Sequence, residues 1–327
     1  MRLRTIIAAC ALAVLAPVLG FVGWRERADI AVWLAPDKTP SASTSDKSKS
    51  ANAKFWDALH GGRYEELPSV IEALTAAYLE NPSDVETTAH IAFSHVWFMG
   101  ERARLEKQSA TITDHIVLAR RYFAEAVRLS PKDERFKGFL ASMELAEGAV
   151  HRDERLLRRG YFDLMAAIEG WPEFNLFTAG YVLSRLPATD SKYAEAIDYQ
   201  WRNLDVCVGE KVDRRTGDYA KYMALETTTG PKRACWNSWI APHNFEGFFL
   251  NMGDMLVKQG DPATARRVYA NAKLSKTYQE WPFKSVLEDR IARAEENVAL
   301  FRNPQPAGKT RTMMISSAFG CTGCHQR

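Results

Sequence analysis

The chain of 327 residues is predicted to be all-α, with its main body between residues 55 and 303. Ala, Leu, Glu and Arg dominate this region, apolar residues recur at spacings of three and four, and helix breakers separate the periodic segments. No alternating run of β-branched residues has the length of a strand. Hydrophobic residues make up 46% of the chain, which is enough for a sizeable core. One elongated helical domain is therefore expected rather than two.

The N-terminus has the features of an export signal. Residues 1–4 carry two positive charges, and residues 5–24 are apolar without a single charge. About 20 such residues can span a bilayer, and this run is long for a cleaved signal. Residues 1–24 are therefore expected to be a signal anchor, with cleavage after Gly20 as the alternative. The rest of the chain is then on the periplasmic side of a bacterial inner membrane, or soluble in the periplasm after cleavage.

Residues 25–54 are expected to connect this anchor to the body. Residues 24–33 combine Trp with charged side chains, which is typical of a membrane interface. Residues 36–54 are rich in Ser, Thr, Lys, Asp and Pro and show no apolar periodicity. Such a composition favours a disordered linker.

A repeated spacing runs through the body. A small or β-branched residue is followed by a large apolar residue, an Ala and a Pro at Ala119-Phe123-Ala126-Pro131, at Gly160-Leu164-Ala167-Pro172 and more weakly at Val70-Leu74-Ala77-Pro82. This pattern resembles the tetratricopeptide repeat (TPR). The resemblance implies a solenoid of about four to six antiparallel helix pairs with a concave groove for a partner, and no chemistry of its own. The prolines are 49 and 41 residues apart, so the repeats would be degenerate and carry insertions.

Residues 304–327 form a C-terminal tail that contains Cys321-Thr322-Gly323-Cys324-His325. Cys-x-x-Cys-His is the attachment signature of a c-type haem. The two thiols add to the porphyrin vinyl groups, and the adjacent His325 becomes the proximal iron ligand. One haem c, held by Cys321 and Cys324, is therefore expected. A dithiol redox pair and a zinc site are less favoured, because no βαβ pattern and no fourth ligand accompany the motif.

A second iron ligand would have to come from upstream. Met313 or Met314 in the tail is a candidate, and so is a histidine of the helical array. The histidines outside the motif show no metal-binding spacing, so each is predicted to be a packed or surface residue; they are His60, His90, His95, His115, His151 and His243.

Two cysteines remain after the others are assigned. Cys10 lies in the apolar segment, and the haem motif takes two more, which leaves Cys207 and Cys235. In an oxidising compartment this pair is expected to form a disulfide that closes a loop of about 29 residues and stabilises by about 3–4 kcal/mol. The alternative is two separately buried thiols.

The sequence predicts an exported c-type haem protein that transfers electrons and docks a redox partner protein or peptide on its repeat groove. A charge balance of 43 basic against 40 acidic residues gives no reason to expect nucleic acid as a partner. No nucleophile elbow, P-loop, Rossmann fingerprint or zinc-protease helix is found, so an enzyme is not favoured. The alternatives are a TPR scaffold or assembly factor, for example in cytochrome maturation, and a haem-based enzyme or gas sensor.

Overall fold

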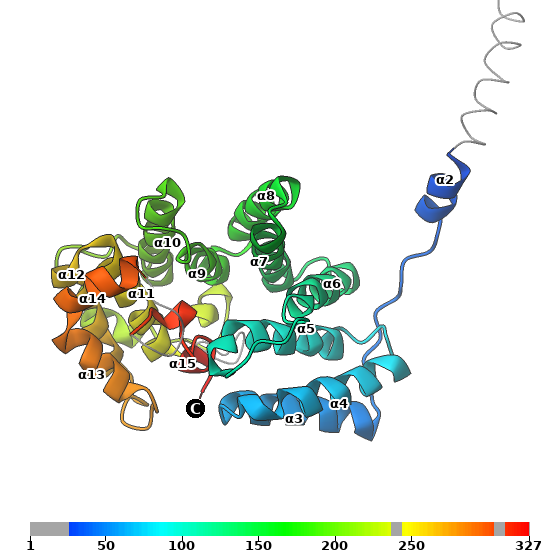
Figure 1. The fold of residues 1–327 in the computed structure, drawn as a ribbon, viewed down its shortest axis with the longest axis horizontal. Coiled ribbons are helices and arrows are strands. Elements are labelled where there is room, and N and C mark those ends of the chain that lie inside the picture. Colours follow the sequence, from blue (N-terminus) through cyan, green and yellow to red (C-terminus); the bar gives the residue numbers. More distant parts are fainter. Residues whose placement is uncertain (1–25, 237–243, 304–310, 327) are drawn as a thin grey trace, which may run out of the picture. The chain divides into compact units, whose positions relative to one another are not determined.

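The structure is a computed structural model that describes residues 26–236, 244–303 and 311–326 (Figure 1). Across these ranges the regular elements are all helices and no strand is found, so the all-α prediction is confirmed. The chain divides into two compact units, residues 1–39 and residues 40–327. Each unit is described by itself.

In the first unit, helix α2 (Arg27–Trp33) buries none of its residues. Val32, Trp33 and Leu34 are 75%, 82% and 66% exposed, an unusual degree for three consecutive apolar side chains. The predicted anchor, residues 1–24, lies outside the described residues. Within the described ranges, no helix has the length and apolar character needed to cross a membrane.

The second unit begins earlier than expected, because helix α3 (Asp46–His60) occupies part of the predicted disordered linker. The Ser45 side chain caps the helix by accepting a hydrogen bond from the Ser48 N–H. Ser48 and Asn52 are buried and hydrogen-bonded to Thr87. The assignment of residues 46–54 to a linker was therefore wrong. This part of α3 packs through small and polar side chains, which a search for apolar periodicity does not detect.

Consecutive helices then pack against each other along the chain. They are α4 (Leu67–Glu80), α5 (Val85–Gly100), α6 (Asp114–Leu129), α7 (Glu134–His151), α8 (Glu154–Gly170), α9 (Pro172–Leu183), α10 (Ser191–Val208), α11 (Phe245–Gln259), α12 (Pro262–Ala270), α13 (Lys284–Ala292), α14 (Ala294–Arg302) and α15 (Thr322–His325).

Each copy of the repeated pattern ends in a Pro that follows its helix. The three pattern residues before the Pro, called a triplet here, occupy equivalent places on α4, α6 and α8. All of their members are buried, including Phe123 on α6 and Leu164 on α8. Gly160 has a specific steric reason, because a Cβ at this position would lie 2.8 Å from the Ala141 carbonyl oxygen of α7. Small residues at this position therefore allow the two helices of a pair to approach closely.

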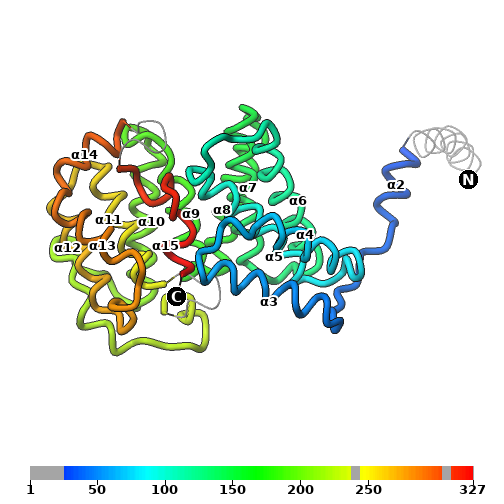
Figure 2. The backbone as a smooth tube through the Cα atoms, turned by 60° about the horizontal axis from the view of Figure 1, so that its bottom comes forward, coloured from blue at the N-terminus to red at the C-terminus, as the bar shows by residue number. Residues whose placement is uncertain are grey.

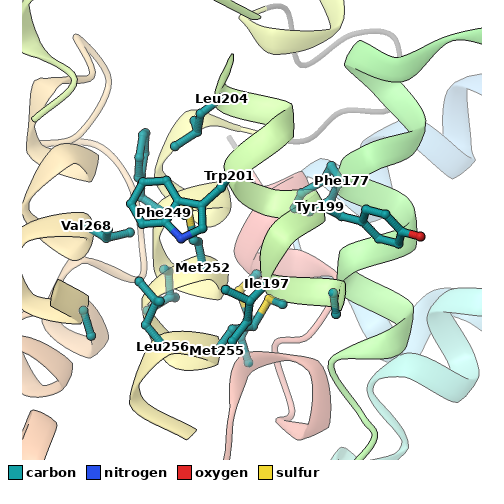
Figure 3. Packing of buried hydrophobic residues seen from close by; sticks show 14 of the residues in the cluster. Phe177, Ile197, Tyr199, Trp201, Leu204, Phe249, Met252, Met255, Leu256 and Val268 are labelled. Carbon is teal, nitrogen blue, oxygen red and sulfur yellow. The ribbon is translucent and has the colours of Figure 1, made fainter. Parts of the chain in front are cut away.

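Two hydrophobic clusters matter for the site. The larger cluster includes Trp201 of α10, Phe249 and Met252 of α11 and Val268 of α12 (Figure 3). A smaller cluster, centred on Phe55, is built by α3, α4 and α5. The C-terminal segment, residues 311–326, contributes side chains to both clusters.

The predicted disulfide is present. Cys207, near the end of α10, is bonded to Cys235 with their Cα atoms 5.8 Å apart. The enclosed stretch leaves the helical array, yet its Tyr219 and Tyr222 are buried in the larger cluster. The disulfide therefore fixes both ends of a long connecting segment, and this segment is itself packed against the hydrophobic core.

Candidate functional site

The C-terminal segment lies between distant parts of the second unit. Its last helix, α15, contacts both α3 and α11, which are far apart in the sequence. Figure 2 shows the segment, in red, passing between the helices of the N-terminal half and those of the C-terminal half of the unit. The final residues of the chain are thus built into the fold.

A buried carboxylate fixes one side of this segment. Glu101, which follows α5, has a fully buried side chain. Its Oε1 accepts hydrogen bonds from the backbone N–H of Cys321 at 2.9 Å, the N–H of Thr322 at 2.6 Å and the Thr322 hydroxyl at 2.8 Å. Arg104 pairs with Glu101 Oε2 at 2.9 Å and donates to the Ala318 carbonyl at 2.7 Å. The N-terminal end of α15 is therefore held by a charge-assisted cluster.

A second buried carboxylate holds the other side. Asp254 of α11 is fully buried and pairs with Arg290 at 3.1 Å. It accepts hydrogen bonds from the Tyr269 hydroxyl at 2.6 Å and from the Met314 N–H at 2.7 Å. Burial raises the pKa of Asp254, while Arg290 and these donors act in the opposite direction. With its charge paired and its oxygens hydrogen-bonded, Asp254 can remain in the core.

Three hydrogen bonds from the rest of the fold are donated to backbone carbonyl groups of this segment. The Tyr181 hydroxyl donates to the Gly320 carbonyl at 2.6 Å, and Trp281 Nε1 donates to the Gly323 carbonyl at 3.1 Å. The backbone N–H of Asn244 donates to the Cys324 carbonyl at 2.6 Å. The bonds to Gly323 and Cys324 satisfy carbonyl groups of a short helix that has few internal partners, and the bond to Gly320 holds the turn before this helix.

The two thiols of the motif face different surroundings. Cys321 packs on the smaller cluster, and a Cβ at Gly100 would lie 2.6 Å from its Sγ. Cys324 belongs to the larger cluster, and a Cβ at Gly247 would lie 2.6 Å from its Sγ. Burial raises the pKa of both thiols, with an added contribution from Glu101 at Cys321. Both thiols are therefore protonated near neutral pH and are weak nucleophiles.

The expectation of one covalently bound haem c is contradicted. Within the ranges that the structure describes, no group of three or more His, Cys, Asp and Glu side chains is placed to hold a metal ion. Cys321 and Cys324 fill gaps in two separate clusters, and the side chains of Met313 and Met314 are buried in the larger one. The roles predicted for these four residues and for His325 as haem and iron ligands depended on that group.

His325 instead lines a cavity of about 360 Å³. Helices α3, α5 and α7 form its other walls, and the lining is mainly aromatic and aliphatic. The lining residues are Phe55, Trp56, Leu59, Val85, Glu86, Ala89, His90, Phe93, Val96, Trp97, Asp133, Arg135, Phe136, Phe139, Cys321 and His325. A volume of this size and an apolar wall with few polar groups are typical of small-molecule sites.

His90 is a buried polar group of this cavity with contacts on several sides. Its ring stacks on Phe55 with centroids 4.4 Å apart, and the Trp56 ring meets it edge-on at 4.9 Å. Its Nδ1 lies 2.5 Å from Asn52 Oδ1. Burial, with the Arg135 charge nearby, lowers the pKa of His90 to about 3. The imidazole is therefore neutral at physiological pH.

The charged side chains of the cavity are one ion pair and one partly buried carboxyl group. The Arg135 guanidinium donates to both carboxylate oxygens of Asp133, with Nε 2.9 Å from Oδ1. Glu86 is partly buried near Asp84, and burial raises its pKa. Apart from these groups, the lining of the cavity is mainly aromatic and aliphatic.

Several site residues were missed at the level of sequence. Asn52 was assigned to the linker, and Glu101 and Arg104 were not singled out. The sequence did hold a signal for Glu101 and Arg104. The spacing between Pro82 and Pro131 is unusually long, because an extra segment between α5 and α6 contains these two residues. His90 was predicted to be a packed or surface residue, and in the structure it is buried.

Comparisons with known proteins give no family assignment. No family model matches the chain, and no curated protein or solved structure is similar to it. A function must therefore be argued from the site.

Proposed function

We propose that this protein is a ligand-binding helical-repeat protein whose own C-terminal segment closes one wall of a cavity for an apolar aromatic group. The observation that carries the proposal is the 360 Å³ cavity with its aromatic lining, completed by Cys321 and His325. We favour binding over catalysis, because protonated thiols are weak nucleophiles and an imidazole with a pKa of about 3 is a weak base at neutral pH.

The repeat architecture supports a binding role. Successive helix pairs with buried small residues at the positions of Ala119 and Gly160 are compatible with TPR-like units. Stacked pairs of this kind create concave surfaces that bind extended segments or partner proteins. In our proposal, residues 311–326 complete the cavity beside α3, α5 and α7, because Cys321 and His325 line its wall.

The lining determines the class of ligand. Aromatic walls favour planar aromatic ligands, because rings gain from stacked and edge-to-face contacts in addition to burial. Burying about 150–200 Å² of apolar surface contributes about 4–5 kcal/mol. This corresponds to a dissociation constant of about 1 mM or somewhat tighter for a two-ring ligand, before any polar contact is added.

We further propose that the protein works outside the cytoplasm, held at the membrane by residues 1–24. The Cys207–Cys235 disulfide supports this location, because such bonds persist in oxidising compartments. The exposed Val32 and Trp33 of α2 and the adjacent Leu34 support a membrane-facing segment. Flotation of the full chain with lipid vesicles, compared with a chain lacking residues 1–34, tests the membrane role. Equal recovery of both chains in the unbound fraction would refute it.

The binding role is tested by calorimetric titration of the full-length protein with 2-methoxynaphthalene. We expect saturable binding at one site. Phe136→Ala removes a lining ring and should weaken binding about 10-fold. Phe123 belongs with Phe136 to a third hydrophobic cluster, built by α5, α6 and α7, but it does not line the cavity, so Phe123→Ala is the control. The control variant should lose stability but keep its affinity. Absence of saturable binding, or equal loss in both variants, would refute the proposed site.

A further inference from the structure

The hydrogen bonds around Asn52 determine which nitrogen of His90 carries the proton. Asn52 Nδ2 lies 2.9 Å from the Ser48 backbone carbonyl and 3.0 Å from Thr87 Oγ1. A carbonyl oxygen can only accept, so Nδ2 must be the amide donor at this position. The Thr87 hydroxyl donates to Asp84 Oδ2 at 2.7 Å, which leaves its oxygen available to accept from Asn52. The orientation of the Asn52 amide is thereby set by its neighbours.

This orientation places Asn52 Oδ1 against the imidazole. Oδ1 is an acceptor without a proton, and it lies 2.5 Å from His90 Nδ1. His90 Nδ1 must therefore be the protonated nitrogen and donate this bond. A neutral imidazole has one donor and one acceptor, so His90 Nε2 is left as a bare acceptor.

The imidazole cannot easily exchange these roles. The stacked Phe55 ring and the edge-on Trp56 ring hold its plane, and His90 is only 5% exposed. Rotation of the ring would break the Asn52 bond in a buried environment, where an unsatisfied polar group is costly. Because His90 lines the cavity and its Nδ1 is already used, Nε2 is the nitrogen that remains for a ligand.

We propose that the cavity selects planar aromatic ligands that carry an O–H or N–H donor, such as phenols and indoles, which donate to His90 Nε2. This inference rests on the proposed function and specifies its ligand class. A ligand that presents only an acceptor would place two lone pairs against each other in a buried site. Such a mismatch discriminates more strongly than a difference in apolar contact.

The test compares two ligands that differ in one methyl group. The probes are 2-naphthol, which has an O–H donor, and 2-methoxynaphthalene, which does not. We expect the wild type to bind 2-naphthol about 10-fold more tightly, the ratio that one net hydrogen bond gives. His90→Phe keeps an aromatic ring on Phe55 and should abolish the preference. The matched control His95→Phe changes a buried histidine of the same helix that does not line the cavity, and should keep it.

The outcomes separate the inference from the proposed function. If both probes bind the wild type equally, the donor preference is refuted while the aromatic site stands. If neither probe binds, the proposed function itself fails.

A second measurement does not depend on the folding of a variant. Long-range ¹H–¹⁵N spectra of the wild-type protein report the tautomer of His90 directly. We expect the Nδ1–H form, and we expect 2-naphthol to shift the Nε2 resonance in the direction of a hydrogen-bonded acceptor. An Nε2–H tautomer, or an Nε2 resonance unchanged at saturating 2-naphthol, would overturn the inference.

Discussion

Replacing Glu101 should release the C-terminal segment from the fold. The Glu101 side chain is fully buried and accepts three hydrogen bonds from Cys321 and Thr322 through one oxygen. Its other oxygen pairs with Arg104, which also binds the segment at Ala318. Glu101→Ala removes both sets of contacts at once.

The expected magnitude follows from the number and burial of these groups. Each buried donor left without a partner costs about 1–3 kcal/mol, and breaking one partner of a buried ion pair costs about 3–5 kcal/mol. These costs are not additive, because the same carboxylate makes all of the contacts and Arg104 can still reach solvent. We therefore expect the free energy that docks residues 311–326 on the fold to decrease by about 3–4 kcal/mol. Glu101→Gln keeps an acceptor oxygen and should lose about half as much.

Hydrogen exchange at the amides of Cys321 and Thr322 measures this effect directly. A loss of about 3 kcal/mol corresponds to a protection factor lower by about 100-fold. Glu147→Ala is the matched control, because its partly exposed pair with Arg120 at 2.6 Å should contribute at most about 1 kcal/mol. Unchanged protection of residues 321–322 in Glu101→Ala would show that the carboxylate does not hold the segment.

Three further predictions concern the fold and its pH dependence. Replacing both Cys207 and Cys235 by Ser should lower the free energy of unfolding by about 3–4 kcal/mol, measured by denaturant titration; an unchanged midpoint would contradict the account. Gly160→Ala should destabilise by about 1–3 kcal/mol in thermal unfolding, because its Cβ would press on the Ala141 carbonyl of α7, and a neutral effect would refute this close packing. The pKa of His90 is about 3 in the folded state and near 6.5 in the unfolded state. Between these pH values the unfolded state binds more protons, so the free energy of unfolding falls as the pH decreases. His90→Phe should reduce the slope of stability against pH by about 1.2 kcal/mol per unit between pH 5 and 6, and an unchanged slope in denaturant titrations at these pH values would exclude a buried neutral His90.

The helical class could be predicted because it depends on the short-range spacing of apolar residues. The disulfide could be predicted because only Cys207 and Cys235 remained after the other three cysteines had been assigned. The triplets at Ala119 and Gly160 mark helix faces that are buried in any helix-pair fold. The start of α3 was missed because Ser48 and Asn52 are polar residues that pack against a partner helix about 35 residues away. Such pairing leaves no periodic signal in the local sequence.

The site could be predicted only in part. A five-residue motif reports residue types and spacing, but it does not report that Cys321 and Cys324 pack into different clusters. The tautomer of His90 likewise depends on Asn52, which is 38 residues away in the chain. Both properties arise from tertiary contacts, and they decide what the cavity can bind.

The central claim is that α3, α5, α7 and the C-terminal segment together form one binding site. Hydrogen–deuterium exchange of the full-length protein, with and without saturating 2-naphthol, tests this claim most directly. We expect increased protection in peptides from α3, α5, α7 and residues 311–326, with no change in α12 and α13. Saturable binding that leaves the exchange of these four regions unchanged, or protects only α12 and α13, would contradict it.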